Sequence, residues 1–578
     1  MKIINQLKRP RYFIPILAIL LLVLIPVLTK KPVEYVDVDS SIVPMNSDYQ
    51  GRYDQVRDTW SDVARPSDAS YHIDATDMTG DIADQAMYDL TDDAVELNDD
   101  GSIEFSVNVD QAGVYEMHIT QRDVSTSILP NRMGVLINGV YQFEEARTIE
   151  LVTEWAFTRT NFARDRYGNE ILPDSNKNDL FLTHALFDST ALNSRPLQFN
   201  LTAGENTIRF DHKAGHALIS DVEIKSIESI PTYDAYLLEH DGANVVDDVI
   251  TVGAESFTSK TNPSTRLTSI NDASATKYDS NYSRLNAIDG YSFRSGNDQI
   301  TYEIETEEAG FYYVAFKYNQ DYLMQMPVFR EIAINGKVPF ENLAIVPFQY
   351  TSDYENMVLG GEDTPYKIYL NEGTNTLSLR VVLDPYQHAY EHVTNMMDEI
   401  TTLSLEIKKL TGNQSDQYRT WELETYIPDI ESRLTSWIET LETLNNGLAT
   451  YSIYDEPGEL THLRLAIEQL TQLREDIDDI PNNMMKLADG DASTTQLLGT
   501  MAQVLLENGL DIEQMNVVGD VDDVPSPEAN IFVRVFESVK RFFLSFRESD
   551  YAVSETDEDV IEIWVNYPRQ YVEIMQQI

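Results

Sequence analysis

One short segment combines residue types that can bind a metal ion and carry out catalysis. The segment His388-Ala-Tyr-Glu-His392 has the spacing His-x-x-Glu-His, which on a helix places two histidines one turn apart as zinc ligands and a glutamate beside them as a base. The sequence shows no evident third ligand, and a short helical face of this kind is often simply exposed to solvent. A zinc-dependent enzyme is therefore kept as an alternative, and no catalytic residue is assigned.

Aromatic side chains are the second group with a recognisable chemistry. An exposed ring can stack on the C–H face of a sugar while polar neighbours bind its hydroxyls. Most aromatic residues of a folded domain are core residues, so each candidate is a separate hypothesis. The candidate sugar contacts are Trp155, Tyr167, Tyr291, Phe293 and Tyr350, with Phe157, Phe348 and Tyr354 as further possibilities.

Composition excludes several other classes of chemistry. The 578 residues include 42 basic and 96 acidic side chains, a formal net charge of −54 that repels nucleic acid. The chain has no cysteine, so it has no disulfide, thiolate metal site or cysteine nucleophile. The sequence contains no P-loop, dinucleotide fingerprint or Gly-x-Ser-x-Gly motif, and a catalytic carboxylate pair cannot be singled out among so many acids.

An internal repeat positions most of these residues. Residues 103–115 return as residues 300–312, each an alternating run that ends in Ala-Gly-aromatic-Tyr. The same spacing carries Val135-Leu-Ile-Asn-Gly139 onto Ile332-Ala-Ile-Asn-Gly336. Alternating runs separated by Gly, Asn and Asp turns indicate antiparallel sandwiches. The sequence predicts two β-sandwich domains, over residues 70–247 and 248–411.

The two copies differ in their insertions, and the last strand of the second copy has an alternative interpretation. The first copy carries an insertion at 144–203 that includes Trp155, and the second carries an inserted helix at 384–400. Residues 222–227 align with residues 405–410, which predicts the closing strand of each domain. The second of these segments also has helical spacing, so one long helix as far as Leu410 is the alternative.

Both ends of the chain have patterns of their own. Basic residues flank an apolar run from Phe13 to Leu28, which predicts a signal anchor or transmembrane helix at 1–31, or alternatively a cleaved signal peptide. The basic cluster favours a cytoplasmic N-terminus and an extracellular body, with residues 32–69 as a stalk. Three-and-four spacing of apolar residues predicts a helical region at 412–548. A strand and helix at 549–578 indicate the start of an α/β domain, most of which we expect to be missing.

The openings of the two sandwiches carry a family resemblance. Asp74-Ala-Thr-Asp77 and Gly253-Ala-Glu-Ser256, with the shared Ile-Asn-Gly and Gly-x-Asn-Thr turns, make both domains similar to carbohydrate-binding modules of the galactose-binding-like jelly-roll kind. The resemblance implies a glycan or oligosaccharide partner. It also implies a structural calcium ion held by an opening glutamate and a last-strand aspartate. Only Glu255 of the second copy and Asp221 of the first match, since Thr76 and Ser404 stand at the other two positions.

The order of the parts resembles a second family. Motifs such as Tyr418-Arg-Thr-Trp421, Gln496-Leu-Leu-Gly499 and the strand from Val560 look like the N-terminal region of large multidomain solute-binding proteins of carbohydrate ABC importers. That resemblance implies permease subunits as partners and places Asn566 and Arg569 where solute contacts would lie. The expected protein is membrane-anchored, extracellular and non-catalytic. The alternatives are a surface metalloenzyme, an accessory of a glycan hydrolase, or a purely structural surface protein.

Overall fold

The computed structural model describes residues 34–36, 38, 51–99, 101–165, 167–416, 418–529, 533, 536, 537, 539 and 540. Within these residues, no helix combines the length and apolar character needed to cross a membrane. The predicted anchor at 1–31 and the predicted α/β unit at 549–578, including Asn566 and Arg569, lie outside the described residues. Everything below belongs to the compact unit that starts at Tyr35.

The first sandwich confirms the antiparallel prediction. One sheet has the order β10-β5-β13-β3-β2, with β1 on β13 and β11 on β5, and the other has the order β4-β12-β6-β7. Strand β4 alternates buried and exposed residues along its length, as a strand with one face on a core must. The strands are β1 (Ser70–Asp74), β2 (Asp81–Ile82), β3 (Val95–Leu97), β4 (Ser102–Val109), β5 (Gly113–Asp123), β6 (Arg132–Ile137), β7 (Ile149–Glu150), β10 (Leu182–Ala185), β11 (Gln198–Leu201), β12 (Gly204–Ala214) and β13 (Ala217–Lys225).

The second sandwich repeats this plan. One sheet has the order β16-β17-β25-β19-β22, with β14 on β25 and β23 on β19, and the other contains β21-β20-β24-β18-β15. Short helices α3 (Tyr53–Asp58), α4 (Gln85–Tyr88) and α5 (Tyr233–Glu239) accompany the two sandwiches. The strands are β14 (Val249–Gly253), β15 (Ser259–Lys260), β16 (Leu267–Thr268), β17 (Ala287–Ile288), β18 (Gln299–Thr306), β19 (Gly310–Asn319), β20 (Val328–Ile334), β21 (Val346–Phe348), β22 (Glu355–Val358), β23 (Ile368–Leu370), β24 (Gly373–Val381) and β25 (Asp511–Val518).

The closing strand of the second sandwich is not where the repeat predicts it. Residues 405–410 lie inside α6 (Asp384–Thr411), a single helix with Val393, Ile400 and Ile407 on its buried face. The structure therefore has the long helix that helical spacing indicated, in place of a short inserted helix and a strand. The closing strand is β25, which pairs with β14 and β19 as β13 pairs with β1 and β5.

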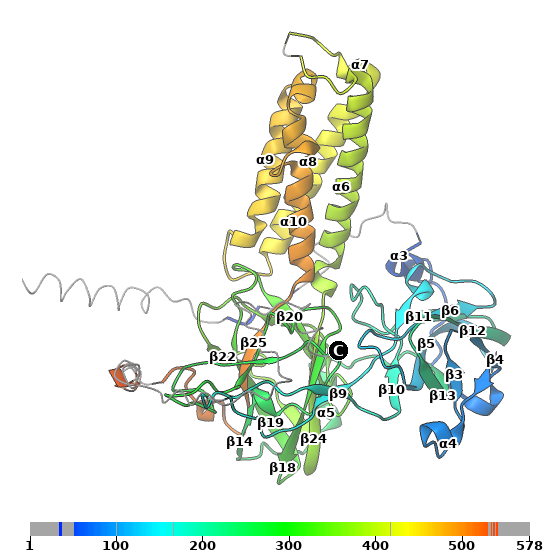
Figure 1. Ribbon diagram of the computed structural model, residues 1–578, viewed down its shortest axis with the longest axis vertical. Helices are drawn as coiled ribbons and strands as arrows, with labels where there is room; N and C mark the ends of the chain where they lie inside the picture. The colour runs from blue at the N-terminus through cyan, green and yellow to red at the C-terminus, as the bar shows by residue number, and fades with distance from the viewer. Residues whose placement is uncertain are drawn as a thin grey trace, which may run out of the picture. The chain divides into compact units, whose positions relative to one another are not determined.

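Four long helices lie among the described residues between β24 and β25. Helices α6, α8 (Ile430–Ala449), α9 (Thr461–Glu475) and α10 (Thr494–Leu506) run side by side (Figure 1). A short helix α7 (Leu423–Tyr426) precedes α8. The predicted helical region thus begins earlier than residue 412, and it contains strand β25. The four-helix bundle is therefore an insertion within the second sandwich. The prediction of a helical region that follows the second sandwich at 412–548 is wrong in this respect.

The insertion of the first sandwich extends a sheet of the second. Strands β8 (Trp155–Phe157) and β9 (Ser175–Lys177) pair with each other, and Trp155 pairs with Lys260 of β15. The ring of Phe157 lies 4.9 Å from the ring of Phe257 in the second sandwich. The two sandwiches are therefore joined by a shared sheet, and the insertion at 144–203 supplies the joining strands.

The two repeated turns are connected to each other by a buried asparagine pair. In the first sandwich Asn138 Nδ2 donates to Asn206 Oδ1 at 3.0 Å, and in the second Asn335 Nδ2 donates to Asn375 Oδ1 at 3.0 Å. Asn375 is fully buried and donates to the carbonyl oxygens of Asn371 and Gly373, which closes the β23–β24 turn. This network explains why the two motifs recur together in the sequence.

Replacing Asn375 by alanine should lower the free energy of unfolding by about 2 kcal/mol, because several buried backbone groups would lose their partner. Chemical unfolding of the variant and the wild type measures this change. Glu372→Gln, at an exposed position of the same turn, is the matched control and should change stability by less than about 0.5 kcal/mol. Equal effects of the two substitutions would contradict the structural role of Asn375.

Candidate carbohydrate-binding site

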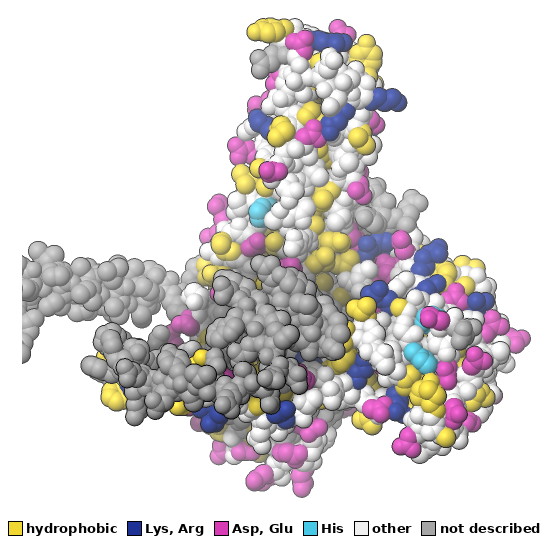
Figure 2. All heavy atoms as spheres, in the orientation of Figure 1, with side chains coloured by type: hydrophobic (Ala, Val, Ile, Leu, Met, Phe, Trp, Pro, Cys, Tyr) yellow, Lys and Arg dark blue, Asp and Glu magenta, His cyan; other side chains and the backbone are white. Residues whose placement is uncertain are grey.

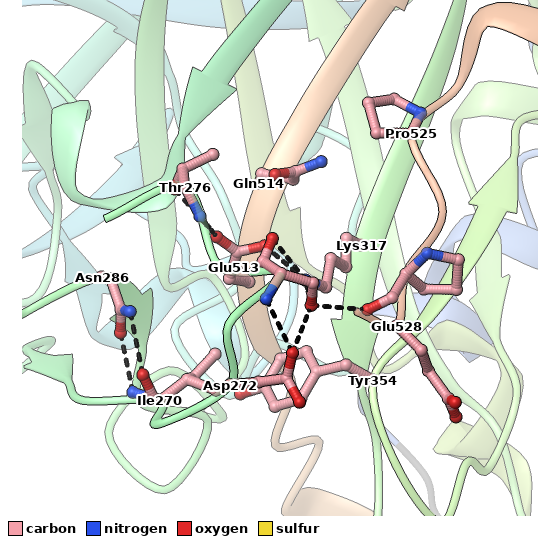
Figure 3. Close-up of polar contacts among 12 residues, drawn as sticks. Ile270, Asp272, Thr276, Asn286, Lys317, Tyr354, Glu513, Gln514, Pro525 and Glu528 are labelled. Atoms are coloured by element: carbon pink, nitrogen blue, oxygen red, sulfur yellow. Dashed lines mark hydrogen bonds and ion pairs between the residues drawn. The ribbon is translucent and has the colours of Figure 1, made fainter. Parts of the chain in front are cut away.

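A buried ion pair fixes the face of the second sandwich that carries β25. Glu513 of β25 and Lys317 of β19 are at most 2% exposed, and the Lys317 Nζ lies 3.0 Å from a carboxylate oxygen of Glu513. The two side chains point toward each other in Figure 3. Two charges taken out of water are stabilising only when they neutralise each other and their remaining hydrogen bonds are satisfied. The pair therefore requires further partners.

A loop over residues 270–286 provides these partners. The Thr276 N–H and hydroxyl donate to Glu513 at 2.7 and 2.8 Å, and Lys317 donates to the Ser274 hydroxyl at 2.9 Å. Ser274 in turn donates to Asp272 at 2.6 Å (Figure 3). The buried charges thus hold this polar loop against the sheet.

A second loop, at 289–294, lies where the chain returns from the bundle to β25. Asp511 accepts hydrogen bonds from Gly290 N–H at 2.6 Å and from the Tyr322 hydroxyl at 2.9 Å. A Cβ atom at Gly290 would lie 2.6 Å from the backbone of Leu510, so only glycine permits this close approach. The Arg294 side chain pairs with Glu507 at 2.8 Å.

The buried Arg330 guanidinium ties the same regions together from beneath. It donates to the carbonyl oxygens of Phe293 at 3.1 Å and Asn508 at 2.7 Å. Burial lowers the pKa of Arg330 to about 9, and the charge of Asp298 opposes this shift. The loop that carries Tyr291 is therefore held in place by contacts with residues on both sides of the bundle insertion.

Tyr291 is the predicted sugar contact whose surroundings best fit a stacking platform. Its side chain is 54% exposed, and the Arg294 guanidinium lies 4.2 Å from the ring centroid. A cation on one face of an exposed ring restricts the ring's orientation. The arrangement can stack a sugar ring while hydroxyl and carboxylate groups of the neighbouring loops bind its hydroxyls.

The other predicted contacts have different surroundings. Tyr167 is 37% exposed, in a turn whose backbone N–H groups at Tyr167 and Asn169 donate to Asp165. Tyr350 is partly buried beside Tyr454, with 6.2 Å between ring centroids. Trp155 and Phe293 were expected to be exposed platforms, but their exposed fractions are 6% and 0%. Trp155 is covered because its segment became a strand of the shared sheet, and Phe293 because it packs beneath its loop against Arg330.

Among the described residues, the group of side chains close enough to share a metal ion includes neither of the two predicted calcium ligands. Asp221 lies beside His72, 3.6 Å from its Nδ1, and Glu255 has one buried carboxylate oxygen without a hydrogen-bond donor among the described residues. Burial raises the pKa of Glu255, and the charges of Glu513 and Glu170 add to the rise against that of Lys277. Glu513, whose charge acts on Glu255, is paired with Lys317. Calcium binding at Asp221 or Glu255 stays a prediction.

Sequence reasoning missed Glu513 because it placed the last strand too early. The residue at the position of Asp221 is Gln514 on β25, since both pair with the opening strand of their sandwich; it is not Ser404, which is buried in α6. The sequence feature that could have indicated strand β25 is the run Asp511-Ile-Glu-Gln-Met-Asn-Val-Val518, which is bounded by Gly509 and Gly519.

The histidine motif lies on α6, as its spacing requires, but its geometry differs from the predicted one. His388 and Glu391 form a group with Asp54 of α3, and their ligand atoms lie within 4.8 Å of one another. His392 does not belong to this group. The third ligand was not evident in the sequence because it precedes the motif by more than three hundred residues.

The comparisons with known proteins connect the bundle to a described family. Residues 388–505 match the sequence model of the bacterial solute-binding protein four-helix bundle domain. This range begins within α6 and ends within α10, so the match covers the inserted bundle and leaves the sandwiches outside it. No curated protein matches the chain.

Several solved structures are similar to parts of the chain. A family 35 carbohydrate-binding module from Clostridium thermocellum is 14% identical, with a TM-score of 0.16, over 28% of this chain and 99% of that chain. A GH26-CBM35 β-(1,4)-mannanase from Podospora anserina is 14% identical over 32% of this chain, with a TM-score of 0.15. A Paenibacillus xanthan lyase is 13% identical over 55% of this chain and 24% of that chain, with a TM-score of 0.17.

The chain spans about a third of the length of the mannanase, of which 31% is covered. TM-scores this low support no argument about fold or function. The sandwich assignment therefore rests on the strand order and pairing described above.

The loop that carries Tyr291 should respond to pH through Asp511. Burial raises the pKa of Asp511 to about 6, and the charges of Asp289 and Asp321 add to the rise against the hydrogen bonds from Gly290 and Tyr322. The folded state therefore binds a proton below about pH 6 that the unfolded state binds only below about pH 4. The contribution of Asp511 to the free energy of unfolding therefore increases as the pH falls through 6, and this contribution is lost as the pH rises through 6.

Chemical unfolding of the wild type and Asp511→Asn at pH 7.5 and pH 5 measures this contribution. The substitution keeps an oxygen acceptor for Gly290 and Tyr322 but removes the titrating group. The wild type should gain about 1 kcal/mol more than the variant on acidification. Other buried acids titrate in both proteins and cancel in the comparison. Identical gains would show that Asp511 does not titrate in this range.

Proposed function

We propose that this protein is a non-catalytic, extracellular carbohydrate-binding component of a solute-binding system. The observation that carries the proposal is the match of the solute-binding-protein bundle family to the four helices inserted between β24 and β25. The insertion places that bundle next to the Tyr291 loop, because residues 507–511 lead directly from the bundle into contacts with the loop. In this proposal, the Tyr291 loop binds the glycan, and the segment that leaves the bundle holds this loop in place.

Acidic charge supports a neutral ligand rather than a polyanion. The net charge is −54, and Figure 2 shows acidic side chains spread over the visible face, with fewer basic ones between them. Such a surface repels nucleic acids and anionic polymers at long range. A neutral oligosaccharide with hydroxyl groups is the ligand class that avoids this cost. Tyr291, Tyr167 and Tyr350 are the proposed contacts, with Tyr291 first.

The same proposal extends to the cellular setting. The apolar run at Phe13–Leu28 would anchor the chain in the cell membrane with its bulk outside, where permease subunits of an ABC sugar importer would be its partners. Solute contacts at Asn566 and Arg569 belong to this part of the proposal. A purely structural surface protein is the alternative, and it differs in predicting no glycan ligand.

Screening the full chain against a glycan array, followed by calorimetry with the best neutral glycan, tests the proposal. Tyr291→Ala should weaken binding by about tenfold, the equivalent of roughly 1.4 kcal/mol of lost stacking. The matched control is Tyr418→Ala, a tyrosine that is 98% exposed but lies in the loop between α6 and α7.

Three outcomes of that experiment would count against parts of the proposal. Absence of any glycan binding would favour the structural alternative. Binding that is unaffected by Tyr291→Ala, or equally weakened by Tyr418→Ala, would remove Tyr291 as the platform. Cleavage of the bound glycan on long incubation would overturn the non-catalytic assignment.

A further inference from the structure

A buried cluster of ionisable side chains lies apart from the proposed sugar site. Asp54 of α3 and Glu391 of α6 are 1% and 0% exposed, and the His388 side chain is 24% exposed. One ligand atom from each residue lies within 4.8 Å of the others. The group brings together the segment before the first sandwich and the first helix of the bundle.

The carboxylate of Asp54 has no donor that satisfies it. Within the described part of the chain, neither of its oxygens accepts a well-aligned hydrogen bond, and the nearest backbone donor is the N–H of the adjacent Gln55. Among the same residues, Nδ1 of His388 likewise makes no hydrogen bond and lies 3.7 Å from a carboxylate oxygen of Glu391. An ionised carboxylate that is buried without hydrogen bonds or a counter-ion costs several kcal/mol, which is why such groups are rare unless they bind a cation. Unsatisfied buried oxygen and nitrogen atoms that converge on one point are the donor set of a metal site.

Arg52, which directly precedes α3, contacts the cluster through Glu391. Arg52 Nε lies 3.4 Å from Glu145 and 3.5 Å from Glu391, and Glu145 is itself buried and accepts from the Tyr53 N–H at 2.8 Å. The Arg52 guanidinium is thus shared between Glu145 and Glu391.

We propose that Asp54, His388 and Glu391 bind a divalent zinc-type transition-metal ion that fastens α3 to α6. An imidazole nitrogen among the ligands favours zinc over calcium, which takes oxygen ligands. Zinc bound tetrahedrally at about 2.0–2.1 Å places its ligand atoms about 3.4 Å apart, a spacing within the 4.8 Å limit of this cluster. His392 is not a ligand in this proposed site. The site therefore differs from the His-x-x-Glu-His arrangement, in which both histidines bind the metal.

Zinc binding to the metal-stripped full chain tests this assignment. Calorimetric titration with zinc chloride, and elemental analysis after gel filtration, should give one zinc per chain and a higher melting temperature. Asp54→Asn and His388→Gln should each weaken zinc binding by at least the roughly 10–100-fold that even second-shell substitutions cost. The matched control, His392→Ala, should bind zinc like the wild type.

The melting temperatures of the metal-free proteins provide a second test of the assignment. Asp54→Asn removes an unsatisfied buried charge, so the metal-free variant should melt no lower than the metal-free wild type, while its zinc-dependent rise is lost. If Asp54→Asn does not fold, His388→Gln carries the test. Absence of stoichiometric zinc in the wild type would overturn the proposal. Loss of zinc from His392→Ala as well, or its retention by both ligand variants, would also do so.

Discussion

The pairing of β25 with β14 and β19 is the constraint on which the rest of the described structure depends. The chain leaves the second sandwich after Val381, forms four helices, and must return to the middle of a sheet at Asp511. A central strand has both of its edges hydrogen-bonded, so the sheet is incomplete until the bundle has been made and the chain has come back. The buried Lys317–Glu513 pair adds a register requirement, because a one-residue slip of β25 would turn Glu513 to the opposite face of the sheet from Lys317.

This topology explains why the candidate sites lie at junctions. The Tyr291 loop is held by Asp511, Glu507 and Arg330, which are contributed by the return segment and by β20. The Asp54–His388–Glu391 group lies where α3 meets the start of the bundle. Scaffold positions within each sandwich are satisfied by their own copy, as the paired asparagines show. The two copies differ at the junctions, where the bundle and the insertion at 144–203 leave the repeat.

The insertion of the first sandwich illustrates how an unmatched segment can change its role. Trp155 lies in a segment outside the repeat, which is why the sequence predicts an exposed ring there. In the structure its backbone pairs with Lys260 at a sheet edge, and the side chain is buried with the added strand. Covering an exposed strand edge removes a site of unwanted association. The insertion is therefore structural at Trp155, and it carries Tyr167 in a turn between the joining strands β8 and β9.

Local patterns in the sequence were sufficient for some features and insufficient for others. Alternating strands, the Asn-Gly turns and the helical spacing of α8 and α9 follow from neighbours a few residues apart, so the two sandwiches and the helices were predictable. The position of β25 was not, because the insertion separates it from its sheet by the whole bundle, and a chance similarity at 405–410 offered a nearer strand. The ligand group of His388 was likewise hidden, since Asp54 lies in a distant helix. The sequence alone determined the elements and their repeat; only the tertiary structure decided which distant residues meet, because burial and charge neutralisation act between groups that the chain order does not bring together.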